Sequence, residues 1–384
     1  MHAATLRRLW LNVHLWIGVG LAVLLIPISI SGGLLVWHDD IDALLNPQRY
    51  AVTGAQVALP PTAYLAKAAE AVAKDPADLR PTGLRYPEEG SPVRVVTRAA
   101  NSEPGKRPRF VTVFLDPPTG NVLDVMEFGS SFIGFLHVFH ENLTLPQYNG
   151  RQIVGWAGVG MLTLSLTGIW LWWPRAGSLL RALRWTRSPH FTFNLHHLLG
   201  FWISLPLAAV SLTGVYLSFP QTAREVMSSV ATVTPNARGG FNGDVMRQTA
   251  LTADRALEIA RQAEPNADPV TLFLPVQQRG EGARGAAWRV QLTRADSGQT
   301  VTVMVDDRGG RAAPTIVPQS GDRAAYWIRW IHEGSHSGLV WSVIVFLTGV
   351  FPTIFAITGV IIWLRKRAAR KSVKTGAAQL RPAE

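Results

Sequence analysis

The sequence of 384 residues contains no cysteine. This absence excludes disulfide bonds, thiolate metal sites, cysteine-ligated iron–sulfur clusters and covalent c-type haem attachment. Charged residues are also scarce, at 16% of the chain, whereas hydrophobic residues make up 47%. The chain is therefore too apolar for an ordinary soluble enzyme and too charged to lie wholly in a membrane. Any metal must be held by His, Asp, Glu, Met or Tyr side chains.

Four apolar runs are long enough to span a membrane as helices. Tryptophan residues gather at their ends, as they do in interfacial belts. We therefore expect a four-helix transmembrane bundle with extramembrane domains. The expected order is span one at 9–37, exported domain one at 39–135, a membrane-proximal segment with span two at 136–173, a loop at 174–190, span three at 191–219, exported domain two at 220–330, a membrane-proximal segment with span four at 331–364, and a tail at 365–384.

Acidic residues are almost missing from three basic stretches, namely the N-terminus, the loop at 174–190 and the tail at 365–384. The positive-inside rule places these stretches in the cytoplasm, which predicts that both termini are cytoplasmic. The remainder of the chain is close to neutral. The net charge of +11 thus reflects membrane orientation, and it gives no support to nucleic-acid binding.

The two long segments between the spans share an order of elements. Each is predicted to contain an amphipathic helix, then alternating strands, then a tight turn. We expect each segment to form a small α+β domain. The helices are predicted at 61–72 and 252–260, and the strands at 92–98, 109–116, 287–292 and 300–306.

The two halves of the chain also resemble each other. His14 and His196 open their spans in the same local sequence, 182 residues apart (196 minus 14). The register holds as far as Gly32 and Gly214. We interpret the chain as an internal duplication of span, exported domain and span.

Several motifs in and beside the spans occur together. They are a His-x-x-x-Gly opening in spans one and three, Thr-Gly followed by aromatic residues in spans two and four, and a His-Glu dipeptide before spans two and four. They occupy residues 14–18, 196–200, 167–175, 358–363, 136–141 and 331–334. With this combination the chain resembles the PepSY-associated transmembrane proteins over nearly its full length. That family includes inner-membrane ferric-siderophore reductases that look like b-type haem carriers. The resemblance implies a bacterial inner-membrane protein with PepSY-like domains in the periplasm.

Most of the ten histidines lie near span ends. A b-type haem needs one neutral imidazole from each of two helices and no covalent link. His14 and His196 are mates in the duplication, so they are predicted to be the axial ligands of a haem at the cytoplasmic side. His197 remains an alternative to His196. Glycine four residues after each histidine, at Gly18 and Gly200, would let a flat macrocycle approach the helix.

Near the outer membrane face, the repeated His-Glu dipeptide favours His140 and His332 as ligands of a second haem b. His137 and His336 remain alternatives, because they share a helix face with these residues if the segments are helical. His38 has no histidine mate and is interpreted as an interfacial or substrate-side residue. Pairs of Ser or Thr with Gly inside the spans permit either close helix packing or contact with a cofactor, and packing alone is enough to explain them.

Residues 332–336 also match the H-E-x-x-H pattern of zinc peptidases. Gly334 weakens the required helix, and the only downstream acid or histidine is Glu384 in the tail. A zinc site is therefore a weaker alternative.

These observations lead to the hypothesis of a membrane oxidoreductase that reduces ferric siderophore and releases iron. Reduction releases iron because oxygen-donor chelators match hard Fe(III) far better than Fe(II). No side chain is expected to act as a catalytic acid, base or nucleophile. The electron donor is expected to be external, either quinol or a cytoplasmic reductase, and the spans contact lipid. The alternative is a non-enzymatic membrane module whose PepSY-like domains bind a protein partner or regulate a peptidase. The sequence leaves open the siderophore and whether the chain forms a homodimer.

Overall fold

The computed structural model describes residues 3–379, except 89, 101–107, 175–182, 184–187, 235–242, 247, 279–285 and 337. Within this part of the chain, four helices are long and apolar enough to cross a membrane. The protein is therefore a membrane protein, as its apolar runs predicted. The four helices are α1 (Ala3–Leu35), α5 (Gly150–Trp172), α7 (Phe191–Ser218) and α11 (Gly338–Gln379). The arginines expected in the loop at 174–190 lie outside the described residues.

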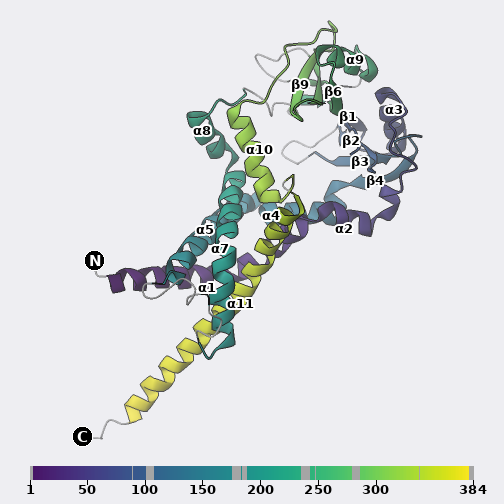
Figure 1. Ribbon diagram of the computed structural model, residues 1–384. Helices are drawn as coiled ribbons and strands as arrows, with labels where there is room; N and C mark the ends of the chain where they lie inside the picture. Colours follow the sequence, from purple (N-terminus) through teal and green to yellow (C-terminus); the bar gives the residue numbers. More distant parts are fainter. Residues whose placement is uncertain are drawn as a thin grey trace. The chain divides into compact units, whose positions relative to one another are not determined.

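The chain divides into two compact units, and the long helices belong to the first, which we call the bundle unit. In it, α1 packs against α5 and α11, and α7 packs against the same two helices (Figure 1). Helices α1 and α7 are therefore diagonal neighbours. Glycine allows α1 and α11 to approach closely, since a Cβ added to Gly349 would lie 2.6 Å from the Cα of Gly33. The bundle unit comprises Met1–His38, Leu136–Ser229 and Ala324–Glu384.

Two shorter helices precede the second and fourth spans. Helix α4 (Phe132–Asn142) leads to α5, and α10 (Ser320–Glu333) leads to α11. Left-handed residues end both helices, among them Leu143 after α4 and Gly334 after α10. These turns let each short helix lie against a span. His140 of α4 forms a hydrogen bond to α1, and His332 of α10 forms one to α7.

The second unit, which we call the soluble unit, comprises Asp39–Phe135 and Val230–Arg323. Its main feature is a seven-stranded antiparallel sheet of order β4-β3-β2-β1-β6-β8-β9. The exported segments were expected as two separate domains, but they share this one sheet because β1 pairs with β6, Leu84 opposite Leu272. The strands are β1 (Leu79–Arg85), β2 (Val93–Ala99), β3 (Phe110–Leu115), β4 (Val122–Glu127), β6 (Ala267–Phe273), β8 (Ala287–Arg294) and β9 (Thr300–Asp306), beside a small pair of β5 (Gly243–Val245) and β7 (Val276–Gln278).

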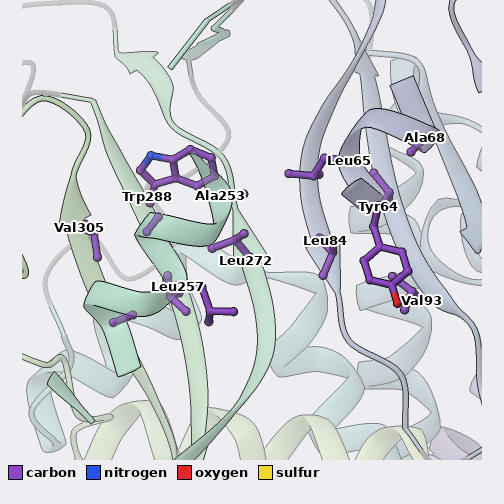
Figure 2. Packing of buried hydrophobic residues seen from close by; sticks show 14 of the residues in the cluster. Tyr64, Leu65, Ala68, Leu84, Val93, Ala253, Leu257, Leu272, Trp288 and Val305 are labelled. Atoms are coloured by element: carbon purple, nitrogen blue, oxygen red, sulfur yellow. The ribbon is translucent and has the colours of Figure 1, made fainter. Parts of the chain in front are cut away.

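Helices α3 (Pro61–Ala71) and α9 (Ala253–Ala263) pack against each other and against the strands of this sheet. Alternate residues of β8 and β9 are buried, as expected of strands with one covered face. Figure 2 shows Leu84 and Leu272 in the middle of the core, between Tyr64 of α3 and Trp288 of β8. One continuous hydrophobic core therefore joins the two halves of the soluble unit.

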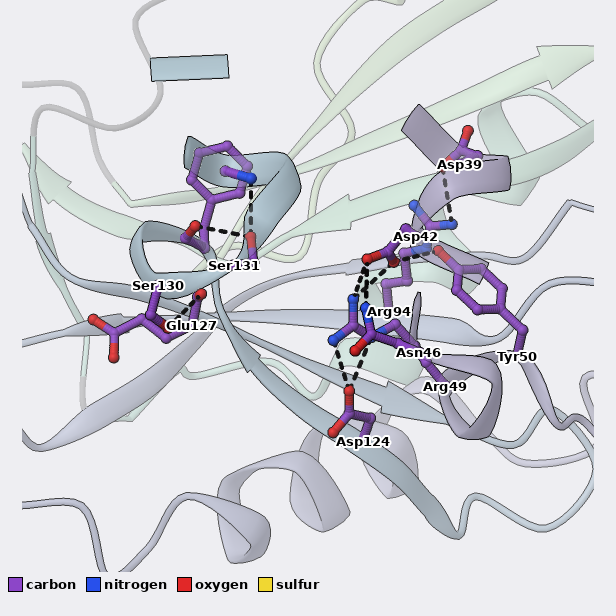
Figure 3. Close-up of polar contacts among 12 residues, drawn as sticks. Asp39, Asp42, Asn46, Arg49, Tyr50, Arg94, Asp124, Glu127, Ser130 and Ser131 are labelled. Atoms are coloured by element: carbon purple, nitrogen blue, oxygen red, sulfur yellow. Dashed lines mark hydrogen bonds and ion pairs between the residues drawn. The ribbon is translucent and has the colours of Figure 1, made fainter. Parts of the chain in front are cut away.

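A buried ionic cluster ties the start of the soluble unit to β4. Arg49 is only 4% exposed, and its Nη1 donates to both carboxylate oxygens of Asp42 at 2.7 Å. Its Nη2 donates to Asp124 of β4 at 2.7 Å (Figure 3). Tyr50 donates to the same Asp42 carboxylate, and burial followed by this hydrogen bond raises the pKa of Tyr50. Asp42 lies on α2 (His38–Leu45).

Candidate metal centres in the helical bundle

Two histidines from diagonal helices face each other in the bundle. The ring centres of His14 on α1 and His196 on α7 are 6.4 Å apart, and the rings are inclined by 78°. We call these residues the first histidine pair. The structure thus brings together the two histidines that occupy matching positions in the similar openings of spans one and three.

Each imidazole of the first pair is held through its Nδ1 atom. Thr167 Oγ1 lies 2.8 Å from His14 Nδ1, and Thr358 Oγ1 lies 2.9 Å from His196 Nδ1. Both threonine hydroxyls already donate to the carbonyl four residues earlier, so they accept from the histidines. Each Nδ1 therefore carries the proton, and each Nε2 carries the lone pair that can bind a metal.

A second histidine pair is formed by the short helices. The ring centres of His140 on α4 and His332 on α10 are 6.2 Å apart, with the rings inclined by 40°. His140 Nδ1 lies 2.9 Å from the carbonyl oxygen of Ile28, and His332 Nδ1 lies 2.9 Å from that of Val210. A carbonyl oxygen can only accept, so both Nδ1 atoms donate and both Nε2 atoms carry lone pairs.

The imidazoles of the second pair are neutral at neutral pH. Burial lowers the pKa of His140, and burial together with the neighbouring His140 lowers the pKa of His332 to about 4. Neutral imidazole is the form that ligates a metal ion.

Every imidazole in the two pairs rests against a hydroxyl residue followed by glycine. The glycine matters most at the second pair, where a Cβ on Gly32 would lie 2.6 Å from His140 Cε1 and one on Gly214 would lie 2.8 Å from His332 Cε1. The sequence left open whether these dipeptides serve helix packing or contact a cofactor, and it did not indicate that each one contacts a histidine. The dipeptides are Thr167-Gly168 at His14, Thr358-Gly359 at His196, Ser31-Gly32 at His140 and Thr213-Gly214 at His332.

The ring separations match two imidazoles bound to opposite sides of one metal ion. With a metal–nitrogen bond of about 2 Å and a nitrogen about 1.15 Å from its ring centre, the two ring centres are about 6.3 Å apart. The observed values are 6.4 and 6.2 Å. All four rings are half-buried, and a Cβ on Gly200, one turn from His196, would meet no atom within 4 Å. The ring separations fit a metal ion held by each pair.

The two pairs lie at different levels along the spans. In α1, His14 and Gly32, which touches His140, are 18 residues apart (32 minus 14). In α7, His196 and Gly214 have the same spacing. This spacing corresponds to about 27 Å along a straight helix, close to the roughly 30 Å of the hydrocarbon core.

His197 and His336 do not join either pair. The ring of His197 stacks on Phe193, 5.8 Å away, and His336 packs its ring against Trp330, 4.8 Å away. The ring of the remaining candidate, His137, lies 6.0 Å from the ring of His38.

The structure lacks the continuous helix that the zinc-peptidase alternative requires at residues 332–336. Helix α10 ends at Glu333, and Gly334 and His336 both have left-handed backbone angles, with φ of 75° and 57°. His332 and His336 therefore do not share a helix face, as the H-E-x-x-H pattern requires. In the described part of the chain, no group of three or more His, Cys, Asp or Glu residues could hold a metal ion.

One family model matches almost the whole chain. It is described as the PepSY-associated TM region and covers residues 11–366. This range includes both histidine pairs and the soluble unit. A search of curated proteins found no match.

Proposed function

The chain belongs to the PepSY-associated TM family, and from this membership we propose that it is a haem-containing reductase of the bacterial inner membrane that reduces ferric siderophore and releases the iron. One observation carries the proposal. Two histidine pairs have ring centres at the separation of bis-imidazole iron, and the hydrogen bonds at each Nδ1 leave the lone pair on Nε2.

In this proposal, His14 and His196 hold one haem b and His140 and His332 hold a second. Bound haem would supply one-electron transfer between the two membrane faces. The protein's own groups orient the imidazoles through their Nδ1 atoms, while the apolar spans exclude water. The distribution of arginines favours the first pair at the cytoplasmic side and the soluble unit in the periplasm. The donor would be quinol or a cytoplasmic reductase.

Absorption spectroscopy tests the proposal directly. The detergent-solubilised protein should show a Soret band that shifts with dithionite, and pyridine haemochrome should give about two haems per chain. A colourless protein from haem-replete cells would contradict the proposal.

Single substitutions separate the two pairs. His14→Ala should retain about one haem, because His140 and His332 do not depend on it. His190→Ala, which changes an exposed histidine at the start of α7, is the matched control and should retain both. Loss of all haem from a folded His14→Ala protein would instead indicate a single shared site.

A kinetic experiment tests the direction of electron flow. His332→Ala should lose ferric-siderophore reduction, while its remaining haem is still reduced by the physiological donor. Stopped-flow absorption measures both steps. Chelate reduction at the wild-type rate would remove His332 from the mechanism.

A second candidate function is favoured by a cleft of about 1070 Å³ in the soluble unit. Its walls come from the start of α3 and from α9, and they combine proline rings such as Pro60 and Pro265 with the side chains of Asp254 and Arg261. Such a cleft suits a non-enzymatic module that binds a protein partner or regulates a peptidase. Under this alternative the protein is colourless and substitutions in the cleft abolish partner binding.

A further inference from the structure

A third pair of histidines lies in the bundle unit, apart from the two pairs described above. The ring centres of His38 and His137 are 6.0 Å apart, and the rings are inclined by 71°. His38 opens α2 directly after the first span, and His137 lies on α4, three residues before His140. His38 is half-buried and His137 is exposed.

The protonation of His38 favours metal binding. Its Nδ1 lies 2.9 Å from the carbonyl oxygen of Leu35. Because a carbonyl oxygen only accepts, Nδ1 carries the proton and Nε2 carries the lone pair. This is the same tautomer that the four histidines of the first and second pairs adopt.

The spacing of the rings is compatible with one shared ion. For a metal–nitrogen bond of about 2 Å, two imidazoles have ring centres about 4.5 Å apart when they bind at right angles and about 6.3 Å apart when they bind on opposite sides. The observed 6.0 Å lies within this range.

We propose that His38 and His137 form a binding site for a divalent first-row transition-metal ion, and that the physiological occupant is the Fe²⁺ released from the ferric chelate. Imidazole is a suitable ligand for Fe²⁺, whereas Fe³⁺ prefers the oxygen donors of the chelate. In the reduction, the chelate gains one electron from the external donor, so that Fe³⁺ becomes Fe²⁺. The identity of the ion rests on the proposed function, but the ability to bind a divalent ion does not.

The site has few protein ligands. No group of three or more metal-binding side chains occurs among the residues that the structure describes, so water must fill the other coordination positions. A two-imidazole site holds its ion weakly and releases it readily, which is suited to an ion in transit.

Calorimetric titration of the purified full-length protein with Ni²⁺ tests the site. We expect one site that is weakened about tenfold or more by His137→Ala and by His38→Asn. Asparagine keeps a donor for the Leu35 carbonyl but has no imidazole lone pair. The control His190→Ala removes an exposed histidine elsewhere and should bind Ni²⁺ as the wild type does. Equal Ni²⁺ affinity in the wild type and both site variants would overturn the proposal.

Two further readouts complete the test. Haem content should be unchanged in both site variants, and loss of a haem from His137→Ala would overturn the proposal by making His137 a ligand of the second pair. Under anaerobic conditions, Fe²⁺ should compete with Ni²⁺ for the site, and failure to compete would overturn the identity of the ion. Ni²⁺ binding in a colourless protein would refute the reductase while leaving the metal site intact.

Discussion

Gly32 offers a sharp test of how the second histidine pair is held. A Cβ added at this position would lie 2.6 Å from Cε1 and 3.0 Å from Nδ1 of His140. Carbon atoms in contact are about 3.5–4.0 Å apart, so the imidazole must move by about 1 Å in the Gly32→Ala protein. Such a movement disrupts the hydrogen bond from His140 Nδ1 to the Ile28 carbonyl and changes the position of the ring relative to His332.

The size of the effect follows from the cost of overpacking. Inserting a methyl group into a close-packed site costs about 1–3 kcal/mol, and each 1.4 kcal/mol corresponds to about a tenfold change in an equilibrium constant. We therefore expect haem at the second pair to bind about tenfold to a hundredfold more weakly. Transfer of haem to an excess of a haem-free acceptor protein measures this loss, and haem at the first pair should be retained.

A matched control lies on the same helix. Gly20 is exposed, and a Cβ added there would meet no atom within 4 Å. Gly20→Ala should therefore keep both haems, with a small gain in helix stability because alanine is the better helix former. Unchanged haem retention in Gly32→Ala would refute the steric reasoning, and equal loss in Gly20→Ala would show that α1 tolerates no change.

Three other predictions concern the first pair, the topology and the soluble unit. Thr167→Val removes the acceptor for His14 Nδ1 and should weaken haem binding at the first pair about 10- to 100-fold in the transfer assay. An unchanged transfer rate would show that the hydroxyl is dispensable. Alkaline phosphatase inserted at Gly298 should be active, and a fluorescent cytoplasmic reporter fused after the C-terminus should be active as well. If both sites are found in the same compartment, the four-span orientation is wrong. Arg49→Ala leaves the buried Asp42 carboxylate without its cation and should destabilise the soluble unit by about 3–5 kcal/mol in denaturant unfolding. An unchanged denaturant midpoint would mean that water replaces the guanidinium.

The pairing of His14 with His196 could be predicted because the two spans open with similar sequences. Residues at matching positions of similar segments are expected at matching heights in a bundle. The preference for His332 over His336 came from the repeated His-Glu dipeptide. In the structure the ring of His332 lies 6.2 Å from that of His140, and His336 packs against Trp330. Whether these residues bind haem stays a prediction.

Other features of the site could not be predicted because they depend on contacts between distant segments. The acceptor for His14 lies on another span, at Thr167, and a threonine inside an apolar helix has an ordinary role in packing. The proximity of His38 to His137 arises from the turn after the first span, and no repeat relates these two residues.

The joining of all seven strands into a single sheet could not be predicted from the sequence either. Alternation of apolar residues predicts that a strand has one buried face, but it does not specify the neighbouring strand. Nothing in the sequence near Leu84 points to Leu272, although the two pair at the centre of the sheet. The helices, by contrast, followed from the length of the apolar runs alone.

The junction of β1 with β6 has a consequence for biosynthesis. Leu84 and Leu272 are separated by 188 residues (272 minus 84). At a synthesis rate of about 5–20 residues per second, the later strand emerges roughly 10–40 s after the earlier one. During this interval β1 has an open edge that can pair with a strand of another nascent chain. The half-made protein is therefore expected to need a chaperone, and a fragment that stops after α5 should aggregate unless a separately expressed second half supplies β6.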